Sequence, residues 1–222
     1  MPQTLPLFPL GSVLYPGLLL PLHVFEDRYR QLVHDLTEGR EPRRFGVIAI
    51  REGRETGADG VLALHEIGCT AALRRVSERD DGRFDLITVG TDRFRLIALD
   101  RSRPYLQGEV EFLSEDTGDE TAAAALVPAV QRAFGAYIEA LNARGAARVS
   151  VPELPSEPIP LSYLVAASVI ADLRDRQLLL ALPDAARRLN AERAMLSRET
   201  SILRSLTSTP APEFRYVPYS PN

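Results

Sequence analysis

The sequence lacks lysine and tryptophan and contains one cysteine, Cys69, among its 222 residues. All 26 basic residues are therefore arginines, a bias that we interpret as the composition of a GC-rich genome rather than as a functional feature. Because one cysteine cannot form an internal disulfide, a disulfide framework is excluded. Chemistry that requires a lysine side chain is excluded as well.

Long apolar runs are also absent. The longest ones, such as Leu18–Leu20 and Leu178–Leu182, are far shorter than the roughly 20 residues that cross a bilayer. No basic residue precedes Arg28, so the start of the chain lacks the charged region of a secretory signal. Without a signal, a membrane span or disulfides, we expect a cytoplasmic protein with no membrane partner.

Charge of one sign is nowhere concentrated, although the net charge is −4. Residues 1–113 hold 15 arginines and 17 acidic residues, and residues 122–222 hold 11 arginines and 9 acidic residues. The remaining 4 acidic residues lie within 114–121. Binding of nucleic acid needs basic residues gathered on one face. The distribution therefore disfavours nucleic acid as a partner.

The first half of the chain has the apolar alternation of strands, and a chain of this length buries roughly 70–75% of its surface on folding. We expect one helix from Glu26 to about Leu36, ended by Gly39, and a hairpin turn at Asp81-Gly82. The strands that we predict span 44–50, 61–76, 84–89, 94–99 and 105–113.

The second half has apolar residues at helical spacing, after a stretch of acids, glycine and threonine over 114–121. Pro128 must lie in the first turn of its helix or kink it, and Asp184 can cap the last helix. We predict helices from about 126 to 145, over 161–173 and 176–182, and after Pro183, with irregular backbone over 151–160 and from 208 on. The predicted organisation is a β domain over 1–115, a helical bundle over 116–207 and a proline-rich tail over 208–222.

No combination of residues typical of catalysis or metal binding is present. Cys69 lies in a predicted strand, where a buried thiol is inert, and the chain has no Gly-x-Ser-x-Gly elbow. His23, His34 and His65 lack the spacing of a zinc site, and we expect His23 to be hydrogen bonded and semi-buried. We therefore predict no catalytic residue, no metal and no cofactor.

The opening of the chain is dense in prolines, apolar residues and charges. The stretch 14–20 holds apolar residues or proline at six of its seven positions, and these cannot all face one side of a strand. Either the rest of the chain covers them, which we favour, or a partner does. Further on, Glu26 or Asp27 is placed to favour the start of a helix. Arg28 either pairs with a carboxylate or lies at the rim of a peptide groove.

Several segments resemble, in order, the amino-terminal substrate-binding domain of Lon, an ATP-dependent protease. The segments are Leu5–Gly11, Pro21–Arg30, Phe45–Val47, Ile67–Ala71, Gly90–Arg95, Pro104–Glu111, Leu161–Ala166 and Asp175–Leu179. Full-length Lon has a phosphate-binding loop ending in Gly-Lys-Ser/Thr and a lysine that activates its catalytic serine, and neither occurs here. The chain is thus similar to the recognition module of Lon without its ATPase and protease domains.

The resemblance implies an α+β fold, a PUA-like β-rich barrel followed by a C-terminal helical bundle. It also implies a stand-alone, non-enzymatic module that binds unfolded or exposed apolar protein segments, for a separate ATP-dependent protease or chaperone or simply to hold them. We expect a monomer or a weak homodimer. The peptide-binding residues that we predict are Leu14, Tyr15, Leu18, Leu19, Phe25, Arg28 and Tyr29.

Two alternative functions stay open. A hydrolase is the third choice, because a catalytic triad is assembled in space rather than in sequence. The second choice is an RNA-binding module, since PUA-like folds often bind RNA and local arginines could contact phosphates while aromatic rings stack on bases. The residues concerned are Arg43, Arg44, Arg74, Arg75, Arg101 and Arg103, with Phe84, Phe94 and Tyr105.

Overall fold

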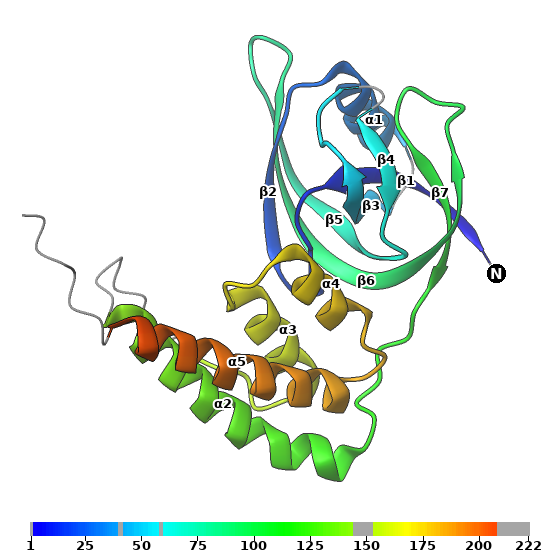
Figure 1. Cartoon of the computed structure of the whole chain (residues 1–222). Helices are drawn as coiled ribbons and strands as arrows, with labels where there is room; N and C mark the ends of the chain where they lie inside the picture. The colour runs from blue at the N-terminus through cyan, green and yellow to red at the C-terminus, as the bar shows by residue number, and fades with distance from the viewer. Residues whose placement is uncertain (1, 40–41, 58–59, 144–152, 208–222) are drawn as a thin grey trace, which may run out of the picture.

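The computed structural model describes residues 2–39, 42–57, 60–143 and 153–207. Its first half is built of strands and its second half of helices, and the two halves lie end to end (Figure 1). This arrangement confirms the predicted α+β class, a β-rich barrel followed by a helical bundle. The predicted tail from 208 on lies outside the described residues, and so does most of the connection between residues 143 and 158.

The strands close into a ring because the first strand pairs on both of its edges. β1 (Gln3–Leu10) runs parallel to β3 (Arg44–Gly53) and antiparallel to β7 (Gln107–Phe112). β5 (Ile67–Glu78) and β6 (Phe84–Asp100) complete the circuit between β3 and β7.

Three further elements lie against this ring. β2 (Leu19–Val24) pairs with the first part of β6, and β4 (Val61–Leu64) pairs with the end of β3. The amphipathic helix α1 (Asp27–Glu38) lies at the end of the ring away from the other helices and buries Tyr29, Leu32 and Val33 (Figure 1).

The strand predictions hold in position but not in length. The segments 84–89 and 94–99 belong to one strand, β6, while the segment 61–76 is divided between β4 and β5. The predicted hairpin turn is confirmed: Gly82, with φ +74°, lies between β5 and β6. β1 and β2 were not predicted, because prolines inside them lack the N–H that a ladder uses and obscure a strand pattern.

The helices are α2 (Glu120–Asn142), α3 (Pro158–Ser168), α4 (Leu173–Ala181) and α5 (Ala185–Thr207). Asp119 caps α2 by accepting a hydrogen bond from the Ala122 N–H, so this helix begins earlier than predicted. Pro128 lies well inside it, so of the two alternatives for this proline the position in the first turn does not hold. The predicted cap at Asp184 is confirmed, since its Oδ1 accepts from the Arg187 N–H at 2.8 Å.

The two halves share one apolar core. Val13, Tyr15, Ala49 and Ile67 come from the strand half and pack in the same cluster as the buried faces of α2, α3, α4 and α5. α3 and α4 lie between the strands and the long helices α2 and α5, which lie side by side and run in the same direction (Figure 1). The division into 1–115, 116–207 and 208–222 stays a prediction, with β7 ending at Phe112 and α2 beginning at Glu120.

Gly90 fixes the loop that precedes β2 against the ring. Its N–H donates to the Leu18 carbonyl at 2.8 Å, and its carbonyl accepts from the Gly17 N–H at 2.9 Å. A Cβ at this position would overlap the backbone carbonyl of Tyr15. Gly90→Ala is therefore expected to lower the free energy of unfolding by about 1–3 kcal/mol, measured by urea denaturation.

The matched control is Gly135→Ala in α2, where a Cβ would meet nothing within 4 Å. Because glycine weakens the interior of a helix, this change should raise the free energy of unfolding by about 0.5–1 kcal/mol. A neutral Gly90→Ala would show that the loop shifts to accommodate the methyl group.

Candidate functional site

A buried arginine joins the ring to the helices. Arg93, on β6, is only 1% exposed. Its guanidinium donates to the carbonyls of Leu180, Leu182 and Pro183 at the C-terminal end of α4 and just beyond, and to Glu115 Oε1 at 2.9 Å. The unpaired carbonyls at a helix C-terminus attract a cation. Arg93 therefore fixes the position of α4 relative to the strands.

A second buried arginine lies deeper in the helical half. Arg188, on α5, donates to Ser162 Oγ at 2.9 Å and stacks over the Tyr163 ring at 4.0 Å. The Tyr163 hydroxyl donates to Glu115 Oε2 at 2.6 Å, and burial raises the pKa of this hydroxyl. One turn along α5, Glu192 is 0% exposed, and neither of its carboxylate oxygens has a hydrogen-bond partner among the described residues.

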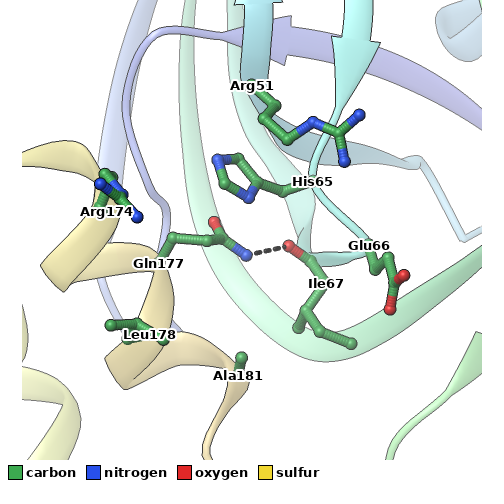
Figure 2. Close-up of a pocket in the computed structure, with 8 residues that line it drawn as sticks. All are labelled: Arg51, His65, Glu66, Ile67, Arg174, Gln177, Leu178 and Ala181. Atoms are coloured by element: carbon green, nitrogen blue, oxygen red, sulfur yellow. Dashed lines mark hydrogen bonds between the residues drawn. The ribbon is translucent and has the colours of Figure 1, made fainter.

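A pocket of about 360 Å³ lies where α4 approaches the strands. We call it the seam pocket. Figure 2 shows its lining, which comes from both halves of the chain: Arg51, His65, Glu66 and Ile67 from the strand half, and Arg174, Gln177, Leu178 and Ala181 from α4. The Gln177 Nε2 donates to the Ile67 carbonyl at 2.8 Å across the junction (Figure 2).

A second pocket, of about 220 Å³, lies between β2, the start of α1 and the end of β1. We call it the β2–α1 pocket. Its apolar wall is formed by Phe8, Leu10, Leu22, Val24, Phe25 and Tyr29. The Phe8 and Tyr29 rings stack with their centroids 4.1 Å apart. The Tyr29 hydroxyl is buried without a hydrogen-bond partner among the described residues, and burial raises its pKa to about 12.

The predicted peptide-binding residues fall into two groups. Leu14, Tyr15 and Tyr29 are buried, and the Tyr15 hydroxyl donates to the Arg176 carbonyl at 2.8 Å. Leu18 is half-buried, while Leu19 and Phe25 are 68% and 51% exposed. The structure thus brings Phe25 and Tyr29 together in the β2–α1 pocket and places Leu14 and Tyr15 in the interior.

Arg28 is held by contacts within the chain. It pairs with Glu26 at 3.0 Å, donates to the Glu55 carbonyl at 3.0 Å and stacks over the Tyr29 ring at 4.4 Å. Glu26 is the N-cap residue of α1, and Asp27 lies in its first turn, where a carboxylate favours the positive end of the helix. The interpretation of this charged group as a helix start with internal ion pairs is confirmed.

Three comparisons with known proteins address the origin of this architecture. A sequence model of the ATP-dependent protease La (LON) substrate-binding domain matches residues 4–198. The chain belongs to the Lon substrate-binding domain family. Lon protease 2 of Myxococcus xanthus is 28% identical over 206 residues, which are 92% of this chain and 24% of that protein. The chain thus spans about a quarter of the length of this relative.

Solved structures agree with the Lon assignment. The Lon N-terminal domain protein from Xanthomonas campestris has a TM-score of 0.60 and 25% identity, covering 86% of this chain and 98% of that one. The N-terminal domain of the Mycobacterium avium complex Lon protease has a TM-score of 0.61 and 18% identity, covering 90% and 98%. The second match concerns the fold alone.

Cys69 and His23, two residues considered for other chemistry, differ in their exposure in this Lon domain. Cys69 is buried, and burial raises the pKa of its thiol, as expected for an inert core cysteine. His23 is more exposed than expected, and its Nδ1 lies 2.8 Å from Asp85. Within the described residues there is no group of three potential metal ligands, and no helix there is long and apolar enough to cross a membrane.

The aromatic rings considered for stacking on RNA bases are in the interior. Phe84, Phe94 and Tyr105 are all buried, and the Tyr105 hydroxyl donates to Asp35 at 2.6 Å. Arg103 pairs with the same carboxylate at 2.9 Å. Rings in these positions cannot stack on a base, so the structure removes this part of the RNA-binding hypothesis.

None of the residues that line the seam pocket is among the peptide-binding residues predicted from the sequence. One signal was available: Arg174, Gln177 and Leu178 have the spacing that places side chains on one face of a helix. Arg51 and His65 gave no such signal, because they meet α4 only through the pairing of β3 and β4 and the docking of the helices.

Proposed function

We propose that this Lon-family domain is a non-enzymatic module that binds exposed apolar segments of other proteins, and that the β2–α1 pocket receives them. The observation that carries the proposal is the Tyr29 hydroxyl, a buried donor without a partner among the described residues, on a side chain that lines a mainly apolar pocket. An unpaired buried polar group is costly, and a peptide carbonyl entering the pocket would satisfy it.

The surroundings of the pocket support a peptide ligand. Phe25 lines it and is half exposed, so its ring can cover an apolar side chain that enters. Leu19, at the other end of β2, is also exposed and extends the apolar surface along the strand. Concave apolar sites with a few placed polar groups are typical of ligand binding.

The fate of the bound segment belongs to the same proposal. The relatives of this chain are Lon proteases, and a bound segment would be passed to a separate ATP-dependent protease or chaperone, or simply held.

Phe25→Asp is expected to weaken binding of a labelled apolar peptide by about tenfold or more, since burying a phenylalanine contributes roughly 1.5–3 kcal/mol. The peptide is acetylated at its N-terminus and amidated at its C-terminus, and binding is measured by fluorescence anisotropy at low and high salt. Binding that rests on apolar burial should persist at high salt.

Leu62→Asp is the matched control, because Leu62 on β4 is 72% exposed and does not line the pocket. It should bind the peptide as the unaltered protein does. Equal affinity of Phe25→Asp and the unaltered protein would contradict the placement of the site. Binding that is lost as salt rises would instead favour a charged ligand such as RNA.

A further inference from the structure

The seam pocket contains an acceptor that the chain does not use. Gln177 is only 6% exposed, and its Nε2 is committed to the Ile67 carbonyl at 2.8 Å. Since a carbonyl can only accept, this contact fixes which end of the amide faces Ile67. The Gln177 Oε1 is left without a donor among the described residues, and in Figure 2 it points toward His65, away from Ile67.

Positive charge is placed on both sides of this acceptor. Arg174 lies in the first turn of α4, where a cation meets the positive end of the helix and does not stabilise it. Its side chain is exposed, and the described residues offer it neither an ion pair nor a hydrogen bond. Arg51 lies across the pocket on β3, with its Nε 3.7 Å from Glu52 in an exposed pair (Figure 2).

The charge of the pocket comes from these arginines rather than from histidine. Burial, together with the neighbouring Arg51, lowers the pKa of His65, so its ring is neutral near pH 7. The acidic residue of the lining, Glu66, lies on the far side of Ile67 from Gln177 in Figure 2. An anion that approaches Arg174 from the Gln177 side does not have to pass this carboxylate.

The rest of the lining is apolar. Leu178 is 64% exposed, and it lies on the same face of α4 as Arg174. Ile67 and Ala181 continue this wall. The pocket volume of about 360 Å³ falls within the roughly 300–1,000 Å³ typical of ligand sites.

The ligand must therefore combine three groups: an anion, an N–H donor next to it and an apolar side chain. Inorganic phosphate satisfies the arginines, and its P–OH can donate to Gln177 Oε1, but it has no apolar group to place against the leucine. The last residue of a polypeptide carries all three groups on one carbon atom. We infer that the seam pocket binds the C-terminal residue of a protein or peptide, with its carboxylate at Arg174, its N–H at Gln177 Oε1 and an apolar side chain against Leu178.

This inference rests on the proposed function, since it assumes that the chain binds protein segments, but it concerns a different pocket. The β2–α1 pocket accepts internal apolar segments, whereas the seam pocket selects chain ends. A single bound protein can occupy both if it presents an apolar stretch and a free C-terminus.

The test compares two labelled peptides that end in leucine and differ only in a free carboxylate or an amide at that end. The free acid is expected to bind about tenfold tighter, because a carboxylate at Arg174 makes charge-assisted hydrogen bonds. Arg174→Glu should abolish this preference. Arg132→Glu, an exposed arginine on α2 outside the pocket, should leave it intact.

Three results would overturn the inference. The first is equal affinity for the acid and the amide, and the second is a preference for the acid that survives Arg174→Glu. The third is inorganic phosphate competing as well as the free-acid peptide does, which would identify a general anion site. Thermal unfolding of Arg174→Glu verifies its fold. The fold should be unchanged, because Arg174 has no ion pair or hydrogen bond among the described residues that the variant could lose.

Failure of the proposed function would give a different experimental result from failure of the inference about the seam pocket. A peptide blocked at both ends that does not bind contradicts the β2–α1 site, whatever the comparison of acid and amide shows. Conversely, Phe25→Asp should leave the preference for the free acid unchanged, because Phe25 does not line the seam pocket.

Discussion

Arg93→Ala is expected to lower the free energy of unfolding by about 3–5 kcal/mol, the usual effect of removing one partner of a buried charged network. The change removes the cation that binds the carbonyls at the end of α4 and leaves Glu115 without its bond at 2.9 Å. Those carbonyls are partly or fully buried, so water cannot simply replace the guanidinium. The measurement is urea denaturation followed by circular dichroism.

Arg95→Ala on the same strand is the control for this prediction. Arg95 is about half exposed and pairs with Glu111 at 3.6 Å, so its loss should change stability by no more than about 1 kcal/mol. A loss below about 1 kcal/mol for Arg93→Ala would mean that the apolar core and the other hydrogen bonds of α4, from Gln177 and to Arg176, are enough to hold it.

Glu192→Gln is expected to make the protein more stable at neutral pH, with a gain that grows as pH rises. Burial raises the pKa of the Glu192 carboxyl well above its usual value, and the opposing effect of Arg188 does not cancel this shift. Because the folded state then holds a proton that the unfolded state has lost, stability falls as pH increases between the two pKa values. The slope approaches about 1.4 kcal/mol for each pH unit in that window.

The measurement is urea denaturation of both proteins at several pH values upward from the ordinary pKa of glutamate. The difference between the two proteins isolates Glu192, because the exposed carboxylates of Asp81, Asp85 and Asp100, whose pKa values are lowered, affect both equally and only at acidic pH. A difference that is independent of pH would show that Glu192 is ionised in the folded protein.

Local patterns predicted most of the elements. The helical spacing of Tyr29, Leu32 and Val33, the turn at Asp81-Gly82 and the capping residue Asp184 each depend on neighbours within a few residues. Such features are specified locally, so they can be read without knowledge of the fold. The change in composition over 114–121 marked the connection between strands and helices for the same reason.

The buried charges and the pockets could not be predicted in this way. Nothing in the sequence distinguishes the buried Arg93 from the exposed Arg95 two positions away, since only the docking of α4 separates them. Glu192 looks like an ordinary surface residue of a charged helix, yet it is buried. The interior position of Tyr15 likewise depends on Arg176, a residue 161 positions away.

The closure of the ring has a consequence for how the chain is made. β1 leaves the ribosome before the other strands of the ring, but its Gln3 pairs with Val110, which is synthesised more than a hundred residues later. Until β7 emerges, one edge of β1 has no partner, and its apolar residues Leu5 and Leu7 cannot be enclosed. Contacts between segments so distant in sequence slow folding. β1 thus lacks this partner until the strands that follow it have been synthesised, and during that time it is itself an unfolded apolar segment of the kind that this domain is proposed to bind.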